Sequence, residues 1–186
     1  MEAFLVSAAS VAVAEIGDKT QLLALVLAAR FRKPWPIVAG ILLATALNHG
    51  IAAELGAWLT TLLSPQVLRW AVAASFIAMG LWILVPDSGE DAAARYAYGA
   101  FLTTLISFFL VEIGDKTQIA TVLLAAKYHS VPLVVTGTTV GILAANVPVV
   151  LAGGFAAERL PLKLIHGVAA VLFIVLGVLA VLAGRL

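Results

Sequence analysis

The sequence predicts an all-α integral membrane protein whose six transmembrane helices form two inverted three-helix repeats. Of its 186 residues, 63% are hydrophobic and 11% are charged, whereas charged residues make up roughly 25% of an ordinary soluble domain. The apolar runs lack the alternating pattern of outer-membrane β-strands, so we interpret them as helices. One seven-residue motif occurs twice, which indicates that the two halves of the chain are repeats of one another.

Six apolar segments are long enough to cross a hydrocarbon core of about 30 Å as helices. The expected segments span residues 3–29, 36–62, 67–85, 97–126, 131–156 and 163–184. The first segment has no basic leader and no evident cleavage site, so we expect a retained helix rather than a signal peptide. Little of the chain is left for a soluble domain.

The repeat is defined by a shift of 97 residues, which aligns Glu15–Phe31 with Glu112–Tyr128. Ten of these seventeen positions are identical, including the motif Glu-Ile-Gly-Asp-Lys-Thr-Gln in both copies. We therefore expect repeats at residues 1–86 and 97–186, joined by a polar linker at 87–96. Because three helices per repeat is an odd number, the second repeat enters the membrane from the opposite side. Transporters built in this way hold their substrate near the midplane, between the repeats.

The motif places ionisable side chains inside apolar segments, where they are costly and normally functional. On a helix, Glu15 and Asp18 are three residues apart and share one face, as do Glu112 and Asp115. If the two motif helices meet, four carboxylates converge. Carboxylate oxygens suit hard divalent cations, and the absence of cysteine excludes thiolate metal sites. The four predicted metal ligands are therefore Glu15, Asp18, Glu112 and Asp115.

Further polar and small residues of the motif support this site. The threonines and glutamines of the motif can supply neutral oxygens, and the glycines can let the helix unwind locally and free backbone carbonyls. The lysines can neutralise the acids of an empty site or pair with the opposite repeat. Two asparagines occupy matching positions in the two halves. The supporting residues are Gly17, Lys19, Thr20, Gln21, Asn48, Gly114, Lys116, Thr117, Gln118 and Asn146.

Carboxylates crowded in a medium of low dielectric take up protons when a bound metal leaves, which gives a physical basis for exchanging metal against protons. The alternative is that the charged residues form buried ion pairs that fix helix packing. His49 and Glu54 have no counterparts in the second half, where Val147 and Ala152 stand. A proton relay and a simple place at a helix interface both remain open for these two residues.

A Glu-x-Gly-Asp-Lys-Thr motif in the first helix of each three-helix repeat resembles the TMEM165/Gdt1 family of small cation transporters. The resemblance covers essentially the whole chain, and the segment Gly141–Pro148 also looks like bacterial members. It implies that the motif acids bind the metal and protons, and that the protein is similar to bacterial manganese exporters. Eukaryotic members resemble Golgi calcium/manganese–proton exchangers.

The resulting expectation is a secondary transporter, not an enzyme, that exports Mn²⁺ in exchange for protons by alternating access at the repeat interface. No cofactor is expected, since the cation is the transported substrate. The oxygen ligands suit Ca²⁺ as well, and only the resemblance puts Mn²⁺ ahead. Two alternatives are a membrane-embedded enzyme acting on a lipid-linked phosphate and a passive cation channel.

Charge also bears on partners and orientation. The net charge of +1 indicates no nucleic-acid partner, and the expected surroundings are a lipid bilayer, namely a prokaryotic plasma membrane. The sequence does not specify an oligomeric state. Basic residues favour the first connection being cytoplasmic and both termini being outside. That side carries Arg30, Arg32, Lys33, Arg95, Arg159 and Lys163, and the other carries Arg69, Lys127 and Arg185.

Overall fold

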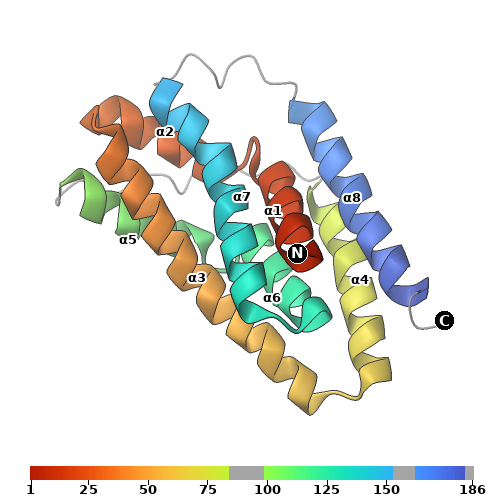
Figure 1. The fold of residues 1–186 in the computed structure, drawn as a ribbon. Coiled ribbons are helices and arrows are strands. Elements are labelled where there is room, and N and C mark those ends of the chain that lie inside the picture. The colour runs from red at the N-terminus through yellow and green to blue at the C-terminus, as the bar shows by residue number, and fades with distance from the viewer. Residues whose placement is uncertain (84–98, 153–161, 183–186) are drawn as a thin grey trace.

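The computed structural model describes residues 1–83, 99–152 and 162–182, and within these ranges the chain forms eight α-helices (Figure 1). The expected linker at 87–96 lies outside the described residues. In chain order the helices are α1 (Glu2–Glu15), α2 (Lys19–Phe31), α3 (Pro34–Leu62), α4 (Pro65–Ile83), α5 (Ala100–Glu112), α6 (Lys116–Tyr128), α7 (Val131–Ala152) and α8 (Leu162–Leu182).

The first and fourth expected segments are each broken into two helices, so the prediction of continuous helices at 3–29 and 97–126 is wrong. The breaks fall on the two copies of the motif. Gly17 has φ 84° and Gly114 has φ 75°, a left-handed conformation that glycine adopts without a steric penalty. The flanking Ile16 and Ile113 are extended, with ψ 120° in both copies. The glycines therefore do unwind the helix locally, and they do so in the same way in both halves.

Helices of one half pack against helices of the other half. In Figure 1, α7 lies beside α1, and α4 lies beside α8. A Cβ added at Gly137 in α7 would lie 2.6 Å from the carbonyl oxygen of Phe4 in α1. A Cβ at Gly40 in α3 would lie 2.9 Å from the carbonyl oxygen of Phe101 in α5. The shift of 97 residues matches Gly40 with Gly137 and Phe4 with Phe101. The same close approach is therefore made twice, each time between a helix of one half and a helix of the other.

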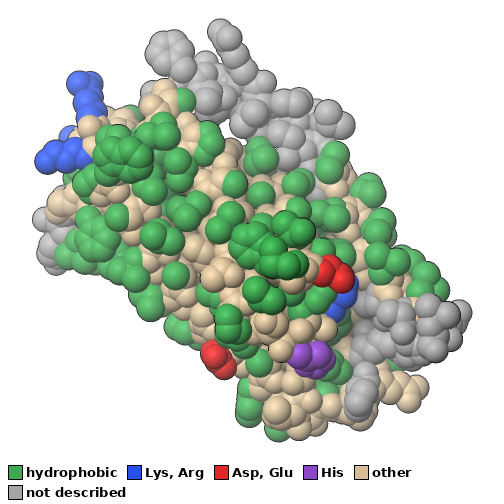
Figure 2. Space-filling model, in the orientation of Figure 1, with side chains coloured by type: hydrophobic (Ala, Val, Ile, Leu, Met, Phe, Trp, Pro, Cys, Tyr) green, Lys and Arg blue, Asp and Glu red, His purple; other side chains and the backbone are tan. Residues whose placement is uncertain are grey.

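The outer surface is apolar and much of the interior is polar. Figure 2 shows one face with many hydrophobic side chains and few charged ones. Exposed residues such as Ile51 (62%) and Leu151 (55%) are suited to contact with lipid, whereas Ser7, Thr104 and Asn146 are fully buried. Two helices, α3 and α7, are long and apolar enough to cross a membrane by length and composition. The described part of the chain is thus all-α and of membrane-protein character.

The glycine contacts give a first testable prediction. Gly137→Ala is expected to lower the free energy of unfolding by about 1–3 kcal/mol, because the added methyl group must push α7 away from the α1 backbone. Gly50→Ala is the matched control, since a Cβ at Gly50 in α3 meets nothing within 4 Å. Thermal unfolding of both variants in detergent checks this. Equal midpoints for the two variants would contradict the close packing of α1 against α7.

Candidate metal centre

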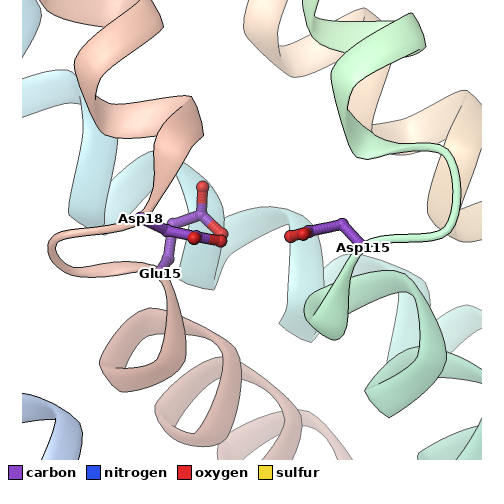
Figure 3. Close-up of side chains that lie close together, drawn as sticks. All are labelled: Glu15, Asp18 and Asp115. Carbon is purple, nitrogen blue, oxygen red and sulfur yellow. The ribbon is translucent and has the colours of Figure 1, made fainter. Parts of the chain in front are cut away.

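Three buried carboxylates converge where the two motif loops face one another. Glu15 is the last residue of α1, and Asp18 and Asp115 are the N-cap residues of α2 and α6. One ligand oxygen of each lies within 4.8 Å of those of the other two. Figure 3 shows Glu15 and Asp18 extending from the first loop towards Asp115 on the second. The carboxylates meet because the loops bring them together, not because they share a helix face, so that part of the prediction is wrong.

The glutamine that ends each motif braces its own loop. Gln21 Oε1 accepts the N–H of Gly17 at 2.9 Å, and Gln118 Oε1 accepts the N–H of Gly114 at 2.7 Å. A broken helix leaves backbone groups without intrahelical partners, and these bonds satisfy one donor in each loop. The glutamine oxygens, predicted as neutral cation ligands, are therefore already engaged by the loop backbone.

The same glutamines tie each loop to the other half of the molecule. Gln21 Nε2 donates to the carbonyl oxygen of Ala145 in α7 at 3.1 Å. Gln118 Nε2 donates to Asn48 Oδ1 in α3 at 2.8 Å, and Asn48 Nδ2 donates to the carbonyl oxygen of Phe109 at the same distance. Asn48 thus supports the second loop rather than offering its oxygen to the carboxylates.

The first acid of the motif is fully buried and retains an unused oxygen. Glu15 Oε1 accepts hydrogen bonds from the hydroxyl of Thr20 and, at 3.3 Å, from Asn146 Nδ2. Among the described residues, neither Glu15 Oε2 nor Asn146 Oδ1 has a hydrogen-bond partner. Buried oxygens are normally satisfied, so these two acceptors suit a bound cation. Asn146 is the asparagine that stays beside the carboxylates.

The motif lysines also lie at this centre. Lys19 Nζ lies 3.2 Å from Asp115 Oδ1, which joins the first loop to the second by an ion pair. The expected pairing of a motif lysine with the opposite repeat is thus observed for Lys19. Lys116 is buried, with 4% of its surface exposed. A cation of the protein therefore partly neutralises the carboxylates.

Glu112 has a different environment from its counterpart Glu15. It is fully buried, but it does not belong to the group of mutually close carboxylates. Its Oε2 lies 3.5 Å from His49 Nε2 and 3.4 Å from the hydroxyl oxygen of Thr117. That hydroxyl is also 3.4 Å from Asp115 Oδ2. Of the four carboxylates expected to converge, three come together, and the fourth faces a histidine at the edge of the centre.

His49 is the residue whose place the sequence left open. It is fully buried, and its Nδ1 lies 3.2 Å from Thr121 Oγ1. The only proton of that hydroxyl is donated to the carbonyl oxygen of Thr117 at 2.8 Å, so we assign the ring proton to Nδ1. His49 Nε2, which lies 3.5 Å from Glu112 Oε2, has no hydrogen-bond partner among the described residues. The sequence signal that could have placed His49 at the site is its position as an ionisable residue inside an apolar segment.

Glu54, the other unmatched ionisable residue, lies away from the centre. Its side chain is exposed on α3, five residues after His49. Because it lies on the outer surface, it does not contact the group formed by Glu15, Asp18 and Asp115. Glu54 therefore serves as a natural reference for a membrane-segment carboxylate outside the site.

The chemistry of the centre is that of a hard-cation site. It offers three carboxylates and further amide and hydroxyl oxygens, with no cysteine anywhere in the chain. It lies between two broken helices, and discontinuous helices of this kind form the ion sites of secondary transporters. Fold and site together define a helical membrane protein with a buried acidic centre between its halves.

Comparison with known families gives this class a name. The family described as "Divalent cation/proton antiporter GDT1" matches residues 3–91 and 100–186. The chain belongs to this family, and the resemblance found from the motifs is confirmed. Membership in a transporter family indicates cation transport as its activity.

Relatives of known name are spread widely. The chain is 50% identical over 177 residues to the "Putative manganese exporter" of Vibrio cholerae, covering 95% of this chain and 88% of the relative. It is 27% identical over 202 residues to "GDT1-like protein sll0615" of Synechocystis, covering 97% of each. It is 25% identical over 200 residues to "GDT1-like protein 4" of Oryza sativa, covering 93% of this chain and 70% of that protein. No solved structure matches the chain.

Proposed function

We propose that this protein is a secondary transporter that exports Mn²⁺ in exchange for protons. The observation that carries the proposal is the group formed by Glu15, Asp18 and Asp115, whose oxygens lie within 4.8 Å of one another and come from both halves. The similarity to a protein named as a manganese exporter favours Mn²⁺ over Ca²⁺ as the substrate. Family membership favours transport over the alternative of an enzyme acting on a lipid-linked phosphate.

The proposed architecture has six membrane spans in two inverted repeats. Each broken pair, α1 with α2 and α5 with α6, forms one span, and α3, α4, α7 and α8 form the others. The repeats correspond to residues 1–86 and 97–186, with the linker at 87–96. The paired glycine contacts and the identical loop breaks support a common origin of the halves. Both termini lie outside a prokaryotic plasma membrane.

The proton coupling follows from the density of acidic groups. Three carboxylates in one buried group repel one another unless a cation is present. In the metal-bound protein, the divalent ion supplies that charge. When the ion leaves, Lys19 and protons taken up from water replace it, so release of metal and uptake of protons are two sides of one step.

Alternating access follows from the position of the centre between the halves. Asp115 comes from the second loop, and Glu15 and Asp18 come from the first. A relative motion of the halves changes the distances between these ligands and opens the site to one side at a time. The glutamine bonds to Ala145 and Asn48 join each loop to the other half's long helix, so this motion must rearrange them.

Flux measurements in proteoliposomes test the function. Protein is reconstituted into vesicles with the membrane voltage clamped, and Mn²⁺ uptake is followed with and without an acidic lumen. We expect proton efflux to drive Mn²⁺ accumulation against its gradient, and a protonophore to abolish that accumulation. Uptake that follows only the Mn²⁺ gradient, whatever the lumenal pH, would instead identify a passive channel. Parallel uptake of Ca²⁺ measures the ion preference.

A further inference from the structure

A pocket of about 380 Å³ opens at the C-terminal end of α2. Its lining combines two kinds of residue. Ala28, Val150 and Leu151 provide an apolar wall shared by α2 and α7, and Arg32 and Lys33 provide two positive charges. Both basic side chains are exposed. Lys and Arg side chains gather over the α2–α3 connection at the upper left of Figure 2.

The backbone turn at this place does not itself require basic residues. Arg32 ends α2 in a left-handed conformation with φ 51°, and its N–H donates to the carbonyl oxygen of Ala28 at 3.0 Å. At the corresponding position of the second half, His129 has the same φ of 51° and the same bond to Ala125. Ser130 there takes the place of Lys33. The turn is made equally well without the Arg-Lys pair, so the pair calls for a separate explanation.

The lining is complementary to an anionic phospholipid in charge and polarity. A phosphate group is recognised by arginine and lysine side chains, while a glycerol backbone and the first acyl carbons need apolar contacts. Trp35, next to the pocket residue Pro34, is 71% exposed, as is common for tryptophan at the membrane–water interface. The basic side chains also lie on the connection predicted to be cytoplasmic, where anionic lipids are concentrated.

We propose that this pocket binds the headgroup of an anionic phospholipid from the leaflet facing the α2–α3 connection. Arg32 and Lys33 contact the lipid phosphate, and the chains leave along Val150 and Leu151. A free phosphate ion is also anionic, but it makes no apolar contact with Ala28, Val150 or Leu151. The site joins α2 of the first half to α7 of the second, so a bound lipid bridges the halves.

Native mass spectrometry of the detergent-purified protein tests this proposal. The protein is titrated with phosphatidylglycerol, with phosphatidylcholine of the same acyl chains and with inorganic phosphate. We expect preferential binding of phosphatidylglycerol, weakened about fivefold in Arg32→Gln and again in Lys33→Gln, and about thirtyfold in the double variant. Lys127→Gln removes a charge from the corresponding connection of the second half and is expected to leave binding unchanged.

Three outcomes would overturn the proposal. They are equal binding of the two lipids, an unchanged affinity in the double variant, and displacement of phosphatidylglycerol by inorganic phosphate, which would identify a simple anion site. Because both basic side chains are exposed, the single variants are expected to fold, and their elution in gel filtration checks this. Lipid binding is measured without Mn²⁺ and without a proton gradient. A failure to bind lipid is therefore distinguishable from a failure to transport Mn²⁺.

Discussion

Asp115→Asn is expected to weaken Mn²⁺ binding by about a hundredfold or more. Even loss of a group that only supports a metal ligand costs about 10–100-fold in affinity, and Asp115 is the one carboxylate that the second loop adds to the group. The substitution also removes the ion pair of Asp115 with Lys19, whose ammonium group lies 3.2 Å from Asp115 Oδ1. The positive charge of Lys19 is then balanced by one carboxylate fewer, and this disfavours the incoming cation. Titration of the purified protein with Mn²⁺, followed by electron paramagnetic resonance of the free ion, measures the effect.

Two further carboxylates provide controls for that experiment. Glu54→Gln removes an exposed carboxylate from α3 and is expected to leave Mn²⁺ affinity unchanged. Glu112→Gln is expected to have a smaller effect than Asp115→Asn, because Glu112 faces His49 and is outside the three-carboxylate group. Equal losses in Glu112→Gln and Asp115→Asn would argue for a site of four equivalent carboxylates. Wild-type affinity in Asp115→Asn would remove the residue from the site.

Lys19→Met is expected to destabilise the metal-free protein by about 2 kcal/mol and to make its stability depend on Mn²⁺. Removing one partner of a buried ion pair costs about 3–5 kcal/mol, and we reduce this figure because the Lys19 side chain is 25% exposed. Asp115, 3% exposed, then lies beside Glu15 and Asp18 without the charge that balanced it. Thermal unfolding in detergent, in a chelator and then with added metal, measures both parts of the effect.

A larger stabilisation of Lys19→Met than of wild type at the same Mn²⁺ concentration separates this prediction from a simple packing defect. Mn²⁺ at about a hundred times its Kd stabilises the folded state by about 2.7 kcal/mol, enough to restore the lost stability. Lys127→Met is the control, since Lys127 contacts the ring of Tyr128 at the far end of α6. A Lys19→Met protein that is as stable as wild type, or that Mn²⁺ does not restore, would contradict a shared role of lysine and metal at the carboxylates.

The closeness of three of the four motif carboxylates could be predicted from the motif, because the residues that shape each loop are adjacent in the sequence. A glycine between two acids within an apolar segment allowed a local break, although continuous helices were expected, and the left-handed Gly17 and Gly114 produce a break in each half. Helical spacing, by contrast, was the wrong reason to bring Glu15 and Asp18 together. The break turns Asp18 into the N-cap of a new helix, and the carboxylates meet only through the fold of the loop.

The differences between the halves could not be predicted from the repeat. An exact repeat of seven residues suggests equivalent acids, yet Glu15 lies beside Asn146 and Glu112 lies beside His49. This asymmetry comes from α3 and α7, where the sequences of the halves have diverged and Val147 stands at the position that matches His49. The role of the motif glutamines could not be predicted either. Their side-chain oxygens accept hydrogen bonds from glycine N–H groups, and these groups become available only when the helix breaks.

The position of a bound Mn²⁺ tests the central claim most directly. Crystals of the protein soaked with Mn²⁺ and measured near the manganese absorption edge give an anomalous difference map that locates the ion without reference to the protein. We predict a single strong peak within bonding distance of Glu15, Asp18 and Asp115. A peak between Glu112 and His49 alone, or one only at the outer surface, would contradict the assignment of the three-carboxylate group as the transport site.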